Sequence, residues 1–344
     1  MAAERLVAVG YQADEEFAKV NSEVLADVAK LVYTYDLDDA GRVDAMRRAD
    51  ALLAYELPKE VPAGALGDPG SPSGQGGAGS PGSLGNLSFV QFLSTGVDSV
   101  DFTQLANSLT VACNAGAYAD AVSEHAVAMT LSLAKRLPQR HAALAAGRFD
   151  KWSPAMTMNG ATCVILGFGG IGTTTARMLR AFGTRICAVT RTGQPADEAD
   201  RTASIADLHQ VLPSADVLVI ALPLTLATRG LIGAPELALM KQSAILVNVG
   251  RGPIIDQAAL YEHLRTHQDF SAGIDTWWAE PAGDAPFSTD YPFLDLPNVL
   301  GSPHNSSIVA GAMTSAARLA AVNVRRYLLG EPVAGVIRRS DYVQ

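Results

Sequence analysis

Three short polar segments in the second half of the sequence each follow an apolar run typical of a buried strand. They are NVGRG, DTWWAEP and SPHN, and they carry Arg251, Glu280 and His304. The paired N–H donors of an arginine match a carboxylate, and histidine exchanges a proton near neutral pH. A glutamate beside that histidine would orient its ring and stabilise the imidazolium. Each residue alone could be a loop residue without a role; together they indicate an anchor, an orienting group and an acid/base.

A glycine-rich turn, LGFGGIG, lies upstream of these segments between a predicted strand and a predicted helix. Gly167 would allow the tight turn, Gly169 would let the backbone approach a pyrophosphate, and Gly172 would let helix and strand pack closely. The N-terminus of the following helix would offer N–H groups to phosphates. Glycine-rich turns are common, but this strand–helix context favours a dinucleotide site. A dinucleotide beside a proton donor predicts hydride transfer to a carbonyl carbon.

Composition excludes several other classes of protein. The chain has 344 residues, 48% of them hydrophobic, and a formal net charge of −9, which argues against nucleic acid or an anionic membrane as the main partner. Cys113, Cys163 and Cys187 lack metal-ligand spacing and read as small core residues in a reducing compartment. No secretory signal is evident, and no apolar stretch approaches the roughly 20 residues of a bilayer span. We therefore expect a cytoplasmic protein with no metal site.

Strand and helix patterns alternate through most of the chain, which predicts parallel, doubly wound sheets. These patterns include a predicted helix around 205–212, a predicted helix over 257–266 and a predicted strand over 271–274. The stretch 62–85 interrupts them, because it is dominated by glycine, proline and serine with almost nothing to bury. We expect a flexible insertion there; a linker between domains and a functional lid are the alternatives. Two turns, 94–98 and 114–118, follow predicted strands at positions where open α/β sheets bind ligands.

Two long helices are predicted, over 120–137 and 306–329. The first is so apolar that it must be buried on most sides. His125 within it is expected to be a packed helix residue and not a ligand. The same structural interpretation covers the remaining histidines outside the polar segments, which are His141, His209, His263 and His267.

The chain resembles the D-isomer-specific 2-hydroxyacid dehydrogenase family. The matching stretches follow the family's order and cover roughly two thirds of the chain; they are LSTGVD (93–98), NAGAYADAVSEHAVAM (114–129), LGFGGIG (166–172), LPLTLATRGLI (222–232), LVNVGRGPIID (246–256), IDTWWAEP (274–281) and LPNVLGSPH (296–304). The resemblance implies interconversion of a 2-keto acid and a D-2-hydroxy acid with an NAD-type cofactor, with Arg251, Glu280 and His304 as the catalytic triad.

The resemblance also implies the binding residues. The substrate carboxylate would be held by Arg251 and by backbone N–H groups of Ser94, Thr95 and Gly96. The pyrophosphate would contact Gly169, Gly170 and Ile171, and Asp275 would hold the nicotinamide carboxamide with backbone near 249–251. The full set of implied cofactor contacts is Gly167, Gly169, Gly170, Ile171, Gly172, Thr190, Arg191, Leu222, Pro223, Thr228, Val249, Gly250, Arg251, Asp275 and His304.

By the same resemblance, the fold is α/β with two doubly wound parallel-sheet domains. A Rossmann nucleotide-binding domain, 119–304, would be inserted into a discontinuous flavodoxin-like substrate domain made of 1–118 and 305–344. The two long helices would join the domains, and the protein would form a homodimer through its nucleotide domains.

The sequence departs from the family pattern at the cofactor. NAD-specific enzymes carry an acidic residue after the second strand of the nucleotide fold, where this chain has Thr190 and Arg191. A 2′-phosphate would not be repelled there, so we expect NADP(H) to be preferred over NAD(H). Glu280 argues against the formate dehydrogenase branch, which has glutamine at this position. Trp277 and Trp278, bulkier than usual, could shape the substrate pocket or only pack.

Two other functions fit parts of this sequence. One is a nucleotide-sensing corepressor of the same family, which the acidic composition and the short segment after the last predicted helix disfavour. The other is a different user of the nucleotide fold, such as a methyltransferase, against which the three polar segments argue. The substrate is left open among glyoxylate, hydroxypyruvate, phosphoglycerate and larger keto acids.

Overall fold

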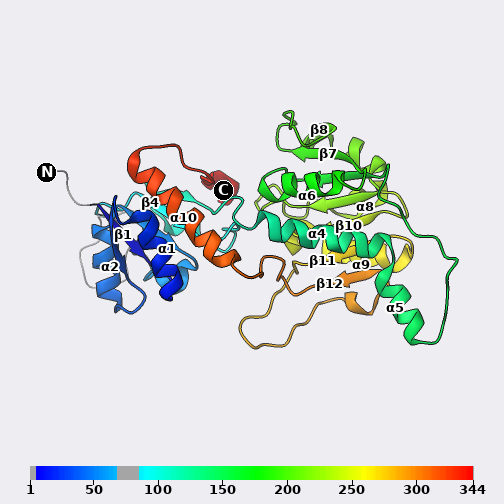
Figure 1. The fold of residues 1–344 in the computed structure, drawn as a ribbon, viewed down its shortest axis with the longest axis horizontal. Coiled ribbons are helices and arrows are strands. Elements are labelled where there is room, and N and C mark those ends of the chain that lie inside the picture. The colour runs from blue at the N-terminus through cyan, green and yellow to red at the C-terminus, as the bar shows by residue number, and fades with distance from the viewer. Residues whose placement is uncertain (1–4, 68–84, 344) are drawn as a thin grey trace. The chain divides into compact units, whose positions relative to one another are not determined.

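The computed structural model describes residues 5–67 and 85–343 and divides into two compact units (Figure 1). The first unit contains Met1–Ala117 and Ala310–Gln344, and the second contains Tyr118–Val309. Each unit has a parallel sheet with helices on both faces, so the predicted α/β class with two doubly wound sheets is confirmed. Within the described residues, none of the helices combines the length and apolar character that a bilayer span demands.

The first unit contains a five-stranded sheet of order β2-β1-β3-β4-β5, the flavodoxin-like order. Its strands are β1 Leu6–Val9, β2 Lys30–Tyr33, β3 Ala51–Ala54, β4 Phe89–Phe92 and β5 Thr110–Ala112, and its helices are α1 Glu15–Leu25, α2 Asp39–Arg48, α3 Leu57–Glu60 and α10 Ala312–Leu329. Alternate strand residues face opposite sides: Leu6 and Ala8 pack with Met46 of α2, whereas Val7 and Val9 pack with α1 and α10. Both faces are therefore buried, which explains the continuous apolar runs.

The second unit contains a seven-stranded sheet of order β12-β11-β10-β9-β6-β7-β8. Its strands are β6 Thr162–Leu166, β7 Arg185–Thr190, β8 Arg201–Ser204, β9 Val217–Ile220, β10 Ile245–Asn248, β11 Ser271–Ile274 and β12 Val299–Gly301. Its helices are α4 Ala119–Ala134, α5 Leu137–Ala145, α6 Gly170–Arg180, α7 Leu208–Val211, α8 Ala234–Leu239 and α9 Gln257–Thr266. The chain turns back at β6, since β7 and β8 lie on one side of it and β9 on the other. Ligands of open α/β sheets bind at such a reversal.

Helices cover both faces of this second sheet as well. α4 packs against α6, β10 and β11 (Figure 1). On the opposite face Leu237 of α8 and Leu260 and Leu264 of α9 are fully buried against the strands.

Three predicted helices differ from the observed ones. The predicted helix 120–137 ends at Ala134, because Arg136 adopts a left-handed conformation (φ 51°) and α5 starts at Leu137, with Pro138 in its first turn. The predicted C-terminal helix begins six residues later than expected, after Gly311 with φ 76°. The predicted helix 205–212 is α-helical only over Leu208–Val211, between 3₁₀ turns.

Most of the stretch predicted to be a flexible insertion, namely 68–84, lies outside the described residues. The residues 62–67 that precede it are turns in which Leu66 is buried, and the Leu66 carbonyl accepts a hydrogen bond from the Ala106 N–H at 2.6 Å. The expectation that this stretch buries almost nothing is therefore wrong at Leu66. Gly85 returns the chain to the sheet with φ 62°, where a Cβ atom would lie 1.9 Å from the Arg47 carbonyl oxygen.

Candidate active site

The candidate site residues of the second unit follow the carboxyl ends of six parallel strands. Because the strands are parallel, these ends lie at one edge of the sheet. The glycine turn follows β6, Thr190 and Arg191 end and follow β7, and Leu222 and Pro223 come after β9. Arg251 follows β10, Asp275 follows β11, and His304 follows β12. The topology thus gathers residues that are far apart in the sequence.

The glycine turn is built so that side chains are excluded at two of its positions. Gly167 has φ 90°, and a Cβ atom on it would lie 2.6 Å from the Ala221 carbonyl oxygen. A Cβ atom on Gly172 would lie 2.0 Å from the Gly167 carbonyl oxygen. Gly169 differs, because no described atom lies within 4 Å of its Cβ position. The structure therefore leaves open space beside Gly169.

The N-terminus of α6 faces this turn without a side-chain cap. Gly169 is its N-cap residue, and no described side chain accepts a hydrogen bond from the first turn at that position. Uncapped N–H groups and the positive end of the helix dipole favour an anion. The space at Gly169 and the uncapped helix end together fit the pyrophosphate of a dinucleotide.

The end of β7 carries no carboxylate in the two positions after Val189. The Thr190 hydroxyl oxygen accepts a hydrogen bond from the Gly193 N–H at 2.9 Å, which closes a turn. Arg191 is exposed next to it. The acidic group that would pair with a ribose 2′-hydroxyl is thus missing here.

Leu222, Pro223 and Thr228 lie in the loop that follows β9. The Thr228 hydroxyl donates to the Pro223 carbonyl oxygen at 2.7 Å and accepts from the Thr225 N–H at 2.8 Å, so it holds its own turn. Leu222 approaches two glycines, since a Cβ atom on Gly250 would lie 2.7 Å from the Leu222 carbonyl oxygen. The same leucine bounds Gly167, where its Cδ2 would be 3.1 Å from the added atom.

Arg251 lies between two positions, 250 and 252, where the packing leaves no room for a side chain. Gly250 packs on Leu222, and a Cβ atom on Gly252 would lie 2.3 Å from the Trp277 carbonyl carbon. The Arg251 guanidinium is half-buried and donates to the Gly250 carbonyl oxygen at 2.8 Å. The close packing of glycine on either side fixes the backbone from which the arginine extends.

Asn248, which was not singled out from the sequence, shapes the same turn. It is fully buried; its Nδ2 donates to the Arg251 carbonyl oxygen at 2.9 Å, and its Oδ1 accepts from the Gly250 N–H at 3.0 Å. A polar residue at the end of the apolar strand ILVN is the signal that could have revealed it.

Glu280 and His304 are joined by a hydrogen bond. His304 Nδ1 lies 2.8 Å from Glu280 Oε2, and Glu280 Oε1 accepts from the Trp277 N–H at 3.0 Å. Burial alone would raise the pKa of Glu280, but the hydrogen bonds from His304 and Trp277 and the charge of Arg251 outweigh it and lower that pKa. The carboxylate therefore accepts the Nδ1 proton, which leaves Nε2 of His304 to exchange a proton.

Asp275 holds the backbone of His304 in an unusual conformation. His304 has φ 50°, and in the described part of the chain it shares a positive φ with only one other non-glycine residue. The His304 N–H donates to the Asp275 carbonyl oxygen at 2.8 Å. Such a backbone conformation costs about 1–2 kcal/mol, so the contacts of the loop must offset this cost.

The Asp275 side chain is fully buried and half satisfied. Its Oδ1 accepts from the Ser302 hydroxyl at 2.6 Å and from the Asn305 N–H at 3.3 Å. Its Oδ2 has no hydrogen-bond partner among the described residues. A buried, unpaired carboxylate oxygen is costly, and it fits a bound group that brings an N–H donor, such as a carboxamide.

His125 of α4 reaches the same cluster. Its Nε2 lies 2.9 Å from the Ser302 hydroxyl oxygen and 3.6 Å from Asp275 Oδ1. The sequence interpretation of His125 as a packed helix residue misses these polar contacts. Helical periodicity places the residue on a buried face but cannot show which polar atoms meet it.

Trp277 and Trp278 are held in different ways. The Trp277 indole donates to the Ser302 carbonyl oxygen at 2.8 Å, and with Phe287 and Leu294 it lines a cavity of about 460 Å³ bordered by Glu280 and His304. Trp278 stacks on Phe293 at a centroid distance of 5.1 Å and donates to the Ile255 carbonyl oxygen. Trp278 is therefore a packing residue.

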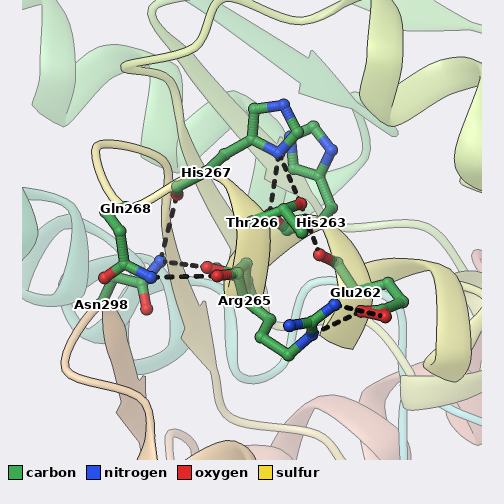
Figure 2. Close-up of polar contacts among 8 residues, drawn as sticks. Glu262, His263, Arg265, Thr266, His267, Gln268 and Asn298 are labelled. Carbon is green, nitrogen blue, oxygen red and sulfur yellow. Dashed lines mark hydrogen bonds and ion pairs between the residues drawn. The ribbon is translucent and has the colours of Figure 1, made fainter.

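Two other histidines form a cluster at the end of α9 (Figure 2). The rings of His263 and His267 stack with centroids 4.1 Å apart, and His263 Nε2 is buried with no hydrogen-bond partner among the described residues. Burial lowers the pKa of His263 to about 4, and His267 adds to the effect. This cluster packs against Phe270, so its role is structural.

Ser94, Thr95 and Gly96 belong to the first unit, where they follow β4. The Ser94 hydroxyl donates to the Gly96 carbonyl oxygen at 2.9 Å, and the Ser94 carbonyl accepts from the Asn114 N–H at 2.8 Å. The three residues are half-buried at the carboxyl end of their sheet. The loop is thus well fixed within its own unit.

Comparisons with known proteins agree with these features. A family model described as the NAD-binding domain of D-isomer specific 2-hydroxyacid dehydrogenases matches residues 127–306. Glyoxylate reductase of Thermococcus gammatolerans is 32% identical over 247 residues, which cover 69% of this chain and 72% of that protein. D-3-phosphoglycerate dehydrogenase of Methanocaldococcus jannaschii is 31% identical over 252 residues, which cover 72% of this chain but 47% of that protein. The chain therefore matches about half the length of this second relative.

Solved structures share the fold. A D-isomer specific 2-hydroxyacid dehydrogenase of Xanthobacter autotrophicus Py2, solved in complex with NADPH and MES, has a TM-score of 0.76 with 23% identity. The similarity covers 99% of this chain and 100% of that chain. Taken with the family match over the second unit, these relatives show that the chain belongs to the D-isomer specific 2-hydroxyacid dehydrogenase family.

Proposed function

We propose that the protein interconverts a 2-keto acid and a D-2-hydroxy acid with NADP(H) or NAD(H). The observation that carries the proposal is the 2.8 Å hydrogen bond between His304 and Glu280, at the sheet edge that also holds the glycine turn and Arg251. The names of two relatives contain glyoxylate and phosphoglycerate, and both compounds belong to this substrate class.

Each member of the triad has a separate role in this reaction. When bound, the cofactor supplies or accepts the hydride at the substrate C2. His304 Nε2 gives a proton to the carbonyl oxygen during reduction and takes it back during oxidation. Glu280 keeps the proton on Nδ1 and stabilises the imidazolium. Arg251, together with backbone N–H groups of 94–96 in the first unit, binds the substrate carboxylate.

The cofactor would be held by the edge of the second sheet. Gly169, Gly170 and Ile171 would receive the pyrophosphate at the α6 N-terminus. Asp275 Oδ2, which lacks a described partner, would accept from the nicotinamide carboxamide. The remaining contacts we assign to this cofactor are Gly167, Gly172, Leu222, Pro223, Thr228, Val249, Gly250 and Arg251.

We also propose a preference for NADP(H) over NAD(H). Neither Thr190 nor Arg191 carries the carboxylate that would repel a 2′-phosphate, and Arg191 is exposed where it could pair with one. The Thr190 hydroxyl is already used to close the turn to Gly193.

A homodimer through the second unit is supported by its exposed apolar residues. α5 extends away from the rest of this unit (Figure 1). Leu144 is 56% exposed, Phe149 79% and Trp152 83%. Large apolar side chains that are this exposed favour an interaction surface when they lie together. We propose the second unit as the nucleotide domain and the first as the substrate domain, and the three free cysteines suit a cytoplasmic location.

A screen of 2-keto acids tests this function directly. Glyoxylate, hydroxypyruvate, phosphohydroxypyruvate and larger keto acids would be offered with NADPH and with NADH, and absorbance would be followed at about 340 nm. We expect oxidation of the cofactor with at least one of them, and its loss in His304→Ala. Absence of turnover with the whole panel, or turnover unchanged in His304→Ala, would contradict the proposal.

A further inference from the structure

The Ser302 hydroxyl lies between a histidine and a carboxylate in the second unit. Its oxygen is 2.9 Å from His125 Nε2 and 2.6 Å from Asp275 Oδ1. Asp275 is fully buried, and the His125 side chain is 28% exposed. The three residues come from α4 and from the ends of β11 and β12, so they join three elements of the sheet edge.

The single proton of the Ser302 hydroxyl decides the direction of these hydrogen bonds. An ionised carboxylate only accepts, and the contact to Asp275 is the shorter of the two, so the proton points to Oδ1. The Ser302 oxygen must then accept from the imidazole. His125 Nε2 therefore carries a hydrogen and is the donor at the start of a chain that runs from His125 through Ser302 to Asp275.

This chain of hydrogen bonds determines which oxygen of Asp275 stays unpaired among the described residues. Oδ1 is occupied by Ser302 and by the Asn305 N–H at 3.3 Å, whereas Oδ2 has no partner among the described residues. Because His125 Nε2 donates to the Ser302 oxygen, the Ser302 hydroxyl must donate its own proton to Asp275. The carboxylate therefore cannot turn without breaking a short hydrogen bond. α4 itself is fixed close by, because the Ser123 hydroxyl donates to the Ile171 carbonyl oxygen at 2.9 Å.

We infer that His125 is a positioning residue for the nicotinamide end of the cofactor. Its N–H fixes the Ser302 hydroxyl, and Ser302 in turn aims Oδ2 of Asp275 at an incoming carboxamide. The inference rests on the proposed function, because it takes NADP(H) or NAD(H) as the ligand. It adds a residue that touches neither cofactor nor substrate and acts through two others.

A purely structural role for His125 makes a different prediction. If the ring only ties α4 to the strand ends, its loss would loosen the whole edge and weaken every part of the nucleotide equally. If it positions Asp275, its loss would affect the nicotinamide half and spare the pyrophosphate half, which binds at Gly169 and the α6 N-terminus.

Binding of the whole cofactor and of its ring-less half separates the two roles. Dissociation constants would be measured for NADPH and for 2′-phospho-ADP-ribose, which lacks the nicotinamide, by fluorescence titration and by calorimetry on the full chain. For His125→Leu we expect the Kd of NADPH to rise about tenfold and that of 2′-phospho-ADP-ribose to change less than about twofold. For His125→Gln, whose amide N–H reaches a similar position, the NADPH Kd should return to within about threefold of the wild type.

Matched variants keep the result interpretable. His209→Leu removes an exposed histidine of the same unit and should change neither constant. If His125→Leu folds poorly, Ser302→Ala removes only a hydroxyl group and should give the same selective loss. An unchanged NADPH Kd in both variants, or equal weakening of both ligands, would overturn the inference. Failure of the wild type to bind NADPH or NADH would overturn the proposed function, and the inference with it.

Discussion

Glu280 uses both oxygens of its carboxylate, one on the His304 ring and the other on the Trp277 backbone. Oε2 lies 2.8 Å from His304 Nδ1, and Oε1 accepts from the Trp277 N–H at 3.0 Å. A carboxylate held at two points cannot rotate away from the imidazole. The pair therefore presents one ring nitrogen in a fixed direction, which is what proton transfer requires.

Replacing Glu280 with glutamine should lower turnover more than substrate affinity. The amide oxygen can still accept from Nδ1, but it no longer stabilises the imidazolium by charge. We expect kcat to fall about 10- to 100-fold, with the KM of the keto acid within about threefold of the wild type. Steady-state kinetics with the best keto acid would measure both. A wild-type kcat in Glu280→Gln would show that the charge of Glu280 is not needed for proton transfer by His304.

Replacement by alanine should affect the stability of the protein differently at two glycines of the turn. In Gly172→Ala the new Cβ atom would meet the Gly167 carbonyl oxygen at 2.0 Å, so the backbone must shift, at a cost of about 1–3 kcal/mol. In Gly169→Ala no described atom is within 4 Å, and the φ of −82° suits alanine.

We therefore expect a lower melting temperature for Gly172→Ala and an unchanged one for Gly169→Ala. The methyl group of Gly169→Ala would nevertheless occupy the pyrophosphate space and raise the Kd of NADPH about tenfold or more. Calorimetry gives both quantities. If Gly169→Ala bound NADPH as tightly as the wild type, the pyrophosphate could not bind at this turn.

Arg191 should control the choice of cofactor. Its removal in Arg191→Ala takes away the cation that follows β7, where we expect the 2′-phosphate, so the KM of NADPH should rise about tenfold while that of NADH stays within about twofold. Thr190→Asp would add the missing carboxylate and should favour NADH. A wild-type enzyme that already uses NADH with the lower KM would refute this account.

The His263 pair should make the protein less stable in mild acid. The pKa of His263 is lowered to about 4 in the folded chain, against an ordinary value of about 6.5. Between these values the unfolded chain binds a proton that the folded chain does not, so the free energy of unfolding falls as the pH drops through this window. Because the ring is partly exposed, we expect a contribution of about 1–2 kcal/mol.

His263→Phe should remove that part of the pH dependence, since it keeps the aromatic packing on Phe270 and has no proton to bind. Urea denaturation at about pH 7.5 and pH 5 would measure the difference. His141→Gln, which removes an exposed histidine, should retain the wild-type pH dependence. If His263→Phe lost as much stability as the wild type between about pH 7.5 and pH 5, His263 would not be the source of the pH dependence.

The elements that follow the glycine turn could be predicted closely from the sequence, because apolar strand runs and polar turns alternate there with few interruptions. Gln257–Thr266 and Ser271–Ile274 have the predicted bounds. The break at Arg136 could not be foreseen from propensity, since arginine rarely adopts a positive φ. In the site, the three polar segments allowed Arg251, Glu280 and His304 to be predicted from the sequence. The contacts of His125 could not be predicted, because they depend on Ser302, which is 177 residues away. Only the folded sheet brings such partners together.

The first unit is assembled from two stretches of chain separated by the whole second unit, and this has a consequence during synthesis. Ala316, Ala317, Ala320, Ala321 and Val324 of α10 are fully buried, and α10 packs against α1, β3 and β4. During synthesis, one face of the five-stranded sheet is therefore covered by α1 alone until 312–329 emerge from the ribosome, while the uninterrupted second unit can already fold. The stretch up to Ala117 is made first, but its unit is completed last, so a chaperone that shields apolar strands would be needed mainly by the residues that left the ribosome earliest.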